Sequence, residues 1–199
     1  RSARARRARS PPSARRIREA GVAARPQQLW VADITYVRIL TGFCYVAFIT
    51  DVFSRSIVGW AVAPTLHTQP LPLLALEHAL LSTGASRNDS GLVHHSDRGS
   101  QYVSLAYSDA LIAAGVKASV GTVGDSYDNA LAETVNGLYK TELIYSKRIW
   151  DSVSEVELAT MGWVHWWNTT RLHEALDYRT PAAVEAAYTH TTTTAPATV

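Results

Sequence analysis

Three acidic residues in separate stretches of the chain could together bind metal ions. Asp33 lies in the middle of the alternating stretch LWVADITYVRI, Asp97 directly follows a short apolar stretch, and Glu133 lies within ALAETVNGLYK. Carboxylate oxygens are hard donors that suit Mg²⁺ or Mn²⁺. Two such ions can activate an attacking oxygen and stabilise a leaving oxygen in phosphoryl transfer. These residue types therefore indicate metal-dependent phosphoryl-transfer chemistry.

Each acid also has a structural interpretation when it is taken alone. An Asp within a strand is more often structural, Asp97 could start a turn, and Glu133 could belong to a solvated helix face. Asn129 and Asn136 lie within about 40–60° of Glu133 on a helical wheel and lower helix propensity without a packing gain. This grouping, with 63 residues between the two aspartates and 35 between Asp97 and Glu133, favours a site.

The elements that must position these acids follow from the hydrophobic pattern. We expect strands at 29–39, 43–52, 56–63, 91–95 and 117–120, and helices at 68–84, 104–115, 128–145 and 151–168. Asp97 is expected at the end of the fourth strand. The order predicts an α/β fold whose five-stranded mixed sheet has three antiparallel meander strands, two parallel strands and helices on its faces.

The same pattern predicts which way two of these elements face. In the first strand, Val31, Thr35 and Val37 share a face with Asp33, whereas Trp30, Ala32, Ile34 and Tyr36 face the other way. In the helix at 128–145, an apolar side of Leu131, Val135 and Leu138 is expected to lie opposite a polar stripe of Asn129, Glu133, Asn136 and Lys140.

Charge is distributed unevenly along the chain. Residues 1–25 carry nine arginines and one glutamate, a net charge of +8, and the remaining residues carry a net charge of −6. The Arg-rich beginning suits a polyanion such as DNA, or is a solvated tail. An acidic body is unusual for a DNA-binding domain, and it is better explained if some of the acids hold cations.

The composition also bounds the domain organisation. We expect a basic, disordered head at 1–27, one catalytic core with a C-terminal helical extension at 28–188, and a disordered tail at 189–199. A single cysteine, Cys44, excludes an internal disulfide framework and favours a reducing compartment. No apolar run is long enough to span a bilayer, and no signal-peptide pattern is present. Because the chain begins on Arg1, we expect a fragment of a longer protein.

Five ordered motifs resemble a known family. LWVADITYV, YVAFITDVFSRSIVGW, HHSDRGSQYVS, YDNALAETVNGLYKTELI and WWNTTRLHEALDYRTPAAV are similar to the catalytic core of bacterial insertion-sequence transposases. The resemblance is to the group with a retroviral-integrase-like Asp-Asp-Glu core, typically made from two overlapping reading frames. It covers about residues 28–187.

This resemblance implies an RNase H-like fold and DNA transposition. It implies that Asp33, Asp97 and Glu133 are catalytic and hold Mg²⁺ or Mn²⁺, with two ions expected. Lys140 would contact the DNA end of the element, and Arg171, His173 and Arg179 would either touch DNA or pack the last helix. The full set of expected DNA contacts is Lys140, Asn129, Asn136, Arg98, Arg171, His173 and Arg179.

The implied partners are element ends and target DNA, bound by a homo-oligomer in the bacterial cytoplasm at the nucleoid, with no membrane association. Two alternatives stay open: a catalytically inactive DNA-binding remnant of a transposase, and an RNase H-like nuclease that cuts RNA–DNA hybrids. Relatives carry a helix-turn-helix region before the core, and RRIREAGVAAR is expected to be its tail. A preference for element-end duplex over hybrid would separate a transposase from the nuclease.

Several other residues are expected to be structural. His94 and His95 should point to opposite faces of their strand and pack in the core or at its edge, and one of them could orient Asp97. Asp51 should stabilise a turn or pair with Arg55. Core packing is also the first interpretation for Trp163, Trp166 and Trp167, with a subunit or DNA contact as the alternative.

Overall fold

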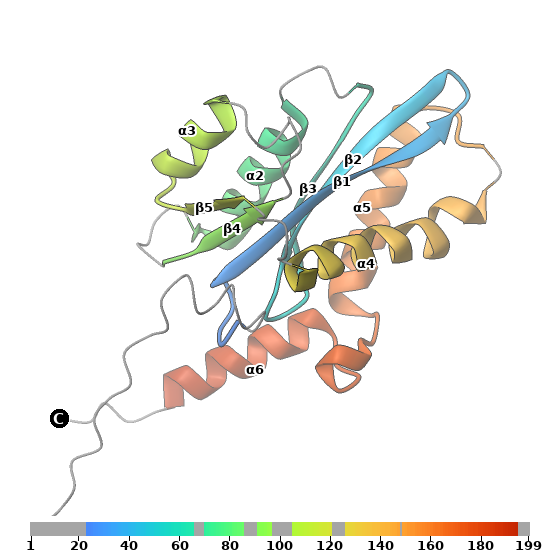
Figure 1. The fold of residues 1–199 in the computed structure, drawn as a ribbon. Coiled ribbons are helices and arrows are strands. Elements are labelled where there is room, and N and C mark those ends of the chain that lie inside the picture. The colour runs from blue at the N-terminus through green and yellow to red at the C-terminus, as the bar shows by residue number, and fades with distance from the viewer. Residues whose placement is uncertain are drawn as a thin grey trace, which may run out of the picture.

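A five-stranded mixed sheet forms the centre of the molecule (Figure 1). The computed structural model describes residues 23–65, 70–85, 91–96, 105–120, 126–147 and 149–194. Strands β1 (Leu29–Ile39), β2 (Gly42–Asp51) and β3 (Ile57–Ala63) form an antiparallel meander. Strands β4 (Val93–Ser96) and β5 (Lys117–Val120) extend it in parallel, in the order β3-β2-β1-β4-β5. The predicted mixed sheet is therefore confirmed.

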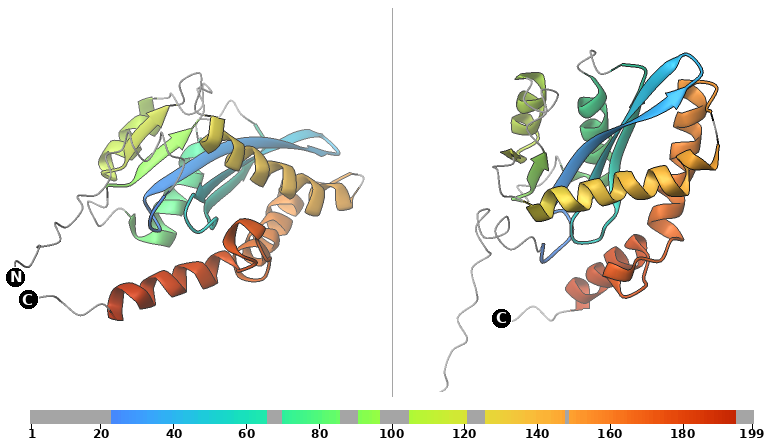
Figure 2. Two further views of the ribbon diagram at one scale, coloured as in Figure 1. Left: turned by 60° about the horizontal axis from the view of Figure 1, so that its bottom comes forward. Right: turned by 45° about the vertical axis from the view of Figure 1, so that its right-hand side comes forward.

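Helices cover both faces of this sheet. Helices α2 (Pro70–Thr83) and α3 (Leu105–Ala113) share one hydrophobic core with the β1 residues Trp30 and Ala32. Helices α4 (Ser126–Glu142) and α5 (Val153–Thr169) share a second core with Val37 and Ile39 of the same strand. The predicted alternation of β1 is thus confirmed, because successive side chains of a strand point to opposite faces. Figure 2 shows α4 lying across β1.

The C-terminal part of the chain packs against the end of the meander. Short 3₁₀ turns at η2 (Ile144–Ser146) and η3 (Glu174–Leu176) precede α5 and the last helix, α6 (Pro181–Thr194). Helix α6 extends to Thr194, past residue 188, where we expected the core to end and a disordered tail to begin. The Tyr188 ring of this helix packs edge-on against Phe53 at 5.5 Å, which ties α6 to the turn after β2. Residues 195–199 lie outside the described residues.

Helix α4 is rotated relative to the prediction. Its most buried residues are Ala132, Val135 and Tyr139, whereas Leu131 and Leu138 are only partly buried. The rotation brings Asn136 into the buried arc, at 8% exposure. Helix α4 packs against both β1 and α5, and these contacts set its rotation. A helical wheel drawn from the sequence contains neither neighbour.

Within the described residues, no helix is long and apolar enough to cross a bilayer.

Candidate active site

Asp33 lies on β1 directly after the residues that pair with the described part of β4. Strand β4 pairs with β1 only over Leu29–Ala32, and its last residue, Ser96, is in register with Ala32. Asp33 is therefore the first residue of β1 beyond the end of β4, and its side chain is half-buried. The carboxyl ends of parallel strands are a common place for ligands in α/β sheets.

Helix α4 contacts Asp33 directly through Asn136. The Asn136 side-chain amide donates a hydrogen bond to Asp33 Oδ2 at 2.7 Å, and the backbone N–H of Ile34 donates to Asp33 Oδ1 at 2.8 Å. A carboxylate has about four lone-pair sites and can accept hydrogen bonds or bind a cation through them.

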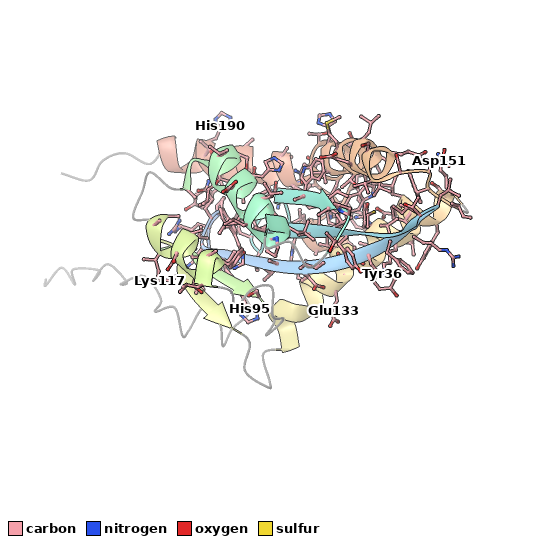
Figure 3. All side chains as sticks on the ribbon, turned by 90° about the horizontal axis from the view of Figure 1, so that it is seen from above. Tyr36, His95, Lys117, Glu133, Asp151 and His190 are labelled. Carbon is pink, nitrogen blue, oxygen red and sulfur yellow. The ribbon has the colours of Figure 1, made fainter. Side chains whose placement is uncertain are left out.

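Glu133 precedes Asn136 by one helical turn and has an exposed side chain. Because residues three apart share a helix face, the contact between Asn136 and Asp33 also directs Glu133 towards that end of the sheet. Figure 3 shows Glu133 on the same side of the molecule as His95 of β4 and Tyr36 of β1. The structure thus brings two of the three predicted acids, Asp33 and Glu133, to neighbouring elements.

The donor set fits a hard divalent cation. Asp33 and Glu133 supply carboxylate oxygens, and Asn136 Oδ1 is buried without a hydrogen-bond partner among the described residues. A buried acceptor of this kind has an unmet need for a donor, such as a water or a metal-bound water. No three His, Cys, Asp or Glu side chains of the described residues group closely enough to hold a metal. The third predicted acid, Asp97, lies outside those residues.

Two further predicted contacts also lie outside the description. Arg98 follows Asp97 in the undescribed segment 97–104. Asn129 lies within α4 one turn before Glu133, and only its backbone is described.

Lys140 reaches from α4 across the open edge of β1. Its ammonium nitrogen lies 4.4 Å from the centre of the Tyr36 ring, a cation–π contact. This distance places Lys140 beside β1 and not in bulk solvent, two turns beyond Glu133. Sequence reasoning selected Lys140 but missed Tyr36, which was assigned only to the face opposite Asp33. An aromatic residue three positions after a candidate catalytic Asp was the signal available in the sequence.

The two adjacent histidines of β4 point to opposite faces, as predicted. His94 is fully buried, and its Nε2 shares a hydrogen bond with the Tyr107 hydroxyl at 3.0 Å. Burial, and to a smaller extent His95, lower the pKa of His94 to about 4. His95 Nδ1 lies 3.2 Å from Ser119 Oγ on β5, and its register partner on β1 is Val31, which shares the face of Asp33. Packing at the core and its edge is therefore the observed role.

The residues of the NTTRLHEALDYRTP segment mainly hold the C-terminal extension in place. Arg171 forms an ion pair with Glu142 of α4 at 2.7 Å and lies 4.8 Å from the centre of the Trp167 ring. His173 is buried, its ring lies 4.5 Å from that of Trp167, and burial lowers its pKa. Arg179 is exposed and donates to the Leu176 carbonyl. The packing interpretation thus accounts for Arg171 and His173.

The remaining candidates are structural. Asp51 is buried and accepts hydrogen bonds from the backbone N–H groups of Gln27, Phe53 and Ser54, which confirms its turn role. Burial raises its pKa to about 6. Cys44 is fully buried, and burial raises its pKa to about 11. Trp163 and Trp167 are core residues, whereas Trp166 is 38% exposed.

The fold and the family follow from comparison with known proteins. An HTLV-2 integrase catalytic core domain in complex with magnesium has a TM-score of 0.58 at 14% identity, over 81% of this chain and 98% of that one. A simian T-cell lymphotropic virus intasome chain has a TM-score of 0.64 at 18% identity, over 82% of this chain and 55% of that one. Integrase catalytic cores are RNase H-like, and so is this fold.

Two family models, both described as "Integrase core domain", match residues 23–126 and 114–181. The chain therefore belongs to the integrase core domain family. Its similar relatives include transposases of bacterial insertion sequences. The transposase for insertion sequence element IS629 of Shigella sonnei is 55% identical over 173 residues, which is 87% of this chain and 56% of that protein. The chain thus spans little more than half the length of that relative.

Proposed function

We propose that this chain is the catalytic core of a DNA transposase that cuts phosphodiesters at element ends and joins them to target DNA. The observation that carries the proposal is the 2.7 Å bond from Asn136 to Asp33, which ties the helix of Glu133 to the strand of Asp33 beside the end of β4. Asp97 follows β4 directly in the sequence and would supply the third acid. The acidic character of the body agrees with a site that holds cations.

Asp33, Asp97 and Glu133 would hold two Mg²⁺ or Mn²⁺ ions, which, when bound, activate the attacking oxygen and neutralise charge on the leaving oxygen. A water would first attack the phosphodiester at the element end and release a 3′-OH. That hydroxyl would then attack a target phosphodiester in line, so no covalent bond forms to the protein. Positioning and charge neutralisation would supply most of the rate enhancement.

The protein's own residues would fix this geometry. Asn136 would hold the Asp33 carboxylate in one orientation, as partners of metal-binding carboxylates commonly do. Lys140, and Arg98 shortly after β4 in the sequence, would neutralise phosphates of the bound strand, and Asn129 would add a polar contact to that strand. Arg179 is the exposed cation of the C-terminal segment and would add a phosphate contact.

The partners would be element ends and target DNA, brought together by a homo-oligomer at the bacterial nucleoid. The Arg-rich residues 1–27 would form a basic head that adds phosphate contacts independent of base sequence, and such contacts weaken steeply as salt rises. The solved HTLV-2 integrase core is described as a dimeric form, which supports an oligomer here by analogy only.

Thermal unfolding with and without Mn²⁺ tests the proposed metal site. A ligand at 100 times its Kd stabilises the folded state by about 2.7 kcal/mol, which would raise Tm by roughly 5–10 °C at this size. We expect this rise for the wild type and for Glu77→Gln, a control on the exposed side of α2. We expect it to be lost in Glu133→Gln. An equal rise in all three proteins would place the metal elsewhere.

A strand-joining assay tests the chemistry separately. Asp97→Asn should abolish joining while the protein still binds DNA, because the substitution removes a metal ligand and leaves the cationic contacts in place. Joining by Asp97→Asn at the wild-type rate would remove Asp97 from the site.

A further inference from the structure

Two exposed aromatic rings lie at the far end of the β1–β2 hairpin. Tyr36 is 57% exposed and Phe43 is 49% exposed, and their ring centres lie 5.6 Å apart at an angle of 83°. Register places them on one face of the sheet, since Tyr36 pairs with Tyr45 and Arg38 pairs with Phe43. Large apolar groups exposed together are typical of an interaction surface.

The part of the sheet that carries these rings lies beyond its covering helix. Helix α2 packs on β2 and β3, where the buried residues Ala47, Ile49, Val58 and Ala61 share a core with it. Strand β4 stops at the level of Ala32, so the edge of β1 from Asp33 to Ile39 has no strand partner among the described residues. Because both rings are exposed, they can be approached from their face of the sheet.

Two cations accompany the rings. Lys140 lies over the Tyr36 ring, and Arg38 is exposed on the same face as Phe43. Neither Lys140 nor Arg38 forms an ion pair with another described residue, so both cations are available to another anion. Aromatic rings interleaved with unpaired cations suit single-stranded nucleic acid, because bases stack on rings while cations meet phosphates.

The rings are also close enough to the candidate active site to share one bound strand. Tyr36 follows Asp33 by three residues, which is about 10 Å along a β-strand and about three base steps of stacked DNA. Lys140 already spans from the helix of Glu133 to Tyr36 around the open edge. Figure 3 shows Tyr36 and Glu133 along the same side of the molecule.

We propose that Tyr36 and Phe43, with Lys140 and Arg38, form a stacking site for an unpaired nucleobase of the DNA strand held at the Asp33 and Glu133 site. This inference rests on the proposed function, since it names the form of DNA that this site takes: a frayed or single-stranded end. The contact between Lys140 and Tyr36 is easily exchanged, because an exposed cation–π contact is weaker than stacking of one base. Lys140 would then move to a phosphate.

The test compares two DNA duplexes of equal length and arbitrary sequence, one fully paired and one with a three-nucleotide unpaired 3′ end carrying 2-aminopurine. The protein is the full chain, without added divalent metal. We expect the wild type to prefer the unpaired end and to quench 2-aminopurine fluorescence, the signature of stacking. Tyr36→Leu should lower affinity for the unpaired end about tenfold and lose the quenching, whereas Tyr36→Trp should retain both.

The Leu and Trp variants separate stacking from simple hydrophobic contact, since both are apolar but only Trp keeps a ring. Leu81→Ala, an exposed residue of α2, should bind as the wild type does. Equal affinity of Tyr36→Leu and the wild type for the unpaired end would overturn the proposal, and so would binding of neither DNA. A concentration-dependent dimer that Tyr36→Leu abolishes, without a preference for the unpaired end, would assign the patch to a protein partner instead.

Failure of the proposed function would give a different result from failure of the stacking site. Glu133→Gln should lose its stabilisation by Mn²⁺ but keep the quenching signal, because stacking requires no metal. Loss of the stacking signal in Tyr36→Leu, with normal stabilisation by Mn²⁺, would separate the two sites in the opposite direction.

Discussion

At the scale of single residues, the contact between Asn136 and Asp33 joins the candidate chemistry to the fold. Asn136 is buried, donates to a carboxylate and keeps one oxygen without a hydrogen-bond partner among the described residues. A hydrogen bond to a charged group stabilises by about 1.5–3 kcal/mol, and a buried unsatisfied oxygen costs about 1–3 kcal/mol. The two effects offset each other, so Asn136 contributes little net stability and its main effect is on the orientation of Asp33.

Asn136→Ala should therefore change metal binding more than folding. We expect the affinity for Mn²⁺ to fall about 10- to 100-fold, as is typical when a partner of a metal ligand is removed, with little change in the free energy of unfolding. A Mn²⁺ titration followed by thermal unfolding measures both. Thr141→Ala is the control, because Thr141 bonds only within α4. A large loss of stability with unchanged Mn²⁺ affinity would make Asn136 a purely structural residue.

At the scale of elements, the close approach of β3 and α2 determines how that face of the sheet is covered. A Cβ placed on Gly59 would lie 2.2 Å from the carbonyl oxygen of Ala75 and 2.7 Å from the Cβ of Ala79. The Ala75 carbonyl is a backbone atom and cannot move aside as a flexible side chain could. Only glycine at position 59 therefore lets α2 lie this close to β3.

Gly59→Ala should destabilise the protein by about 3 kcal/mol or more, because overpacking forces α2 away from β3. Gly162→Ala is the matched control: it lies within α5 with no atom within 4 Å of an added Cβ, and it should stabilise by about 0.5–1 kcal/mol. Urea unfolding of both variants measures the difference. Equal stabilities would mean that α2 does not pack on β3 at Gly59.

At the scale of the whole molecule, burial of ionisable groups links stability to pH. His94 has a folded pKa of about 4, below its ordinary 6.5, so between these values the unfolded chain binds more protons than the folded one. Its contribution is present above pH 6.5 and is lost as pH falls towards 4. Asp51 acts in the opposite direction, because its folded pKa of about 6 lies above its ordinary 3.8.

His94→Gln should remove the first of these contributions while an amide retains a polar partner for the Tyr107 hydroxyl. The free energy of unfolding of the wild type relative to His94→Gln should fall by roughly 3 kcal/mol between pH 6.5 and pH 4, since a pKa unit corresponds to about 1.4 kcal/mol. Urea unfolding across this range gives the difference curve, in which the effect of Asp51 cancels. A flat difference curve would show that His94 titrates normally in the folded protein.

The sequence by itself determined the elements and the identity of the candidate acids. Strand β1 was predicted with its observed ends, and its two faces were assigned correctly, because alternation along a strand is a local property. The carboxylates could be selected because their spacing and motifs are properties of the chain alone. The bond between Asn136 and Asp33 was not predictable, since 103 positions separate the two residues and only folding joins them.

Tertiary structure determined which residues of a helix face the core and where some helices end, because both depend on packing. The rotation of α4 buries Ala132 and Tyr139 because the helix packs against both β1 and α5. The threonine-rich end of α6 has low helix propensity, yet it continues to Thr194 beyond the anchor of Tyr188 on Phe53. The contact of Lys140 with Tyr36 joins α4 to β1, two elements that lie far apart in the sequence. Each of these features depends on contacts between segments distant in sequence, which local patterns do not contain.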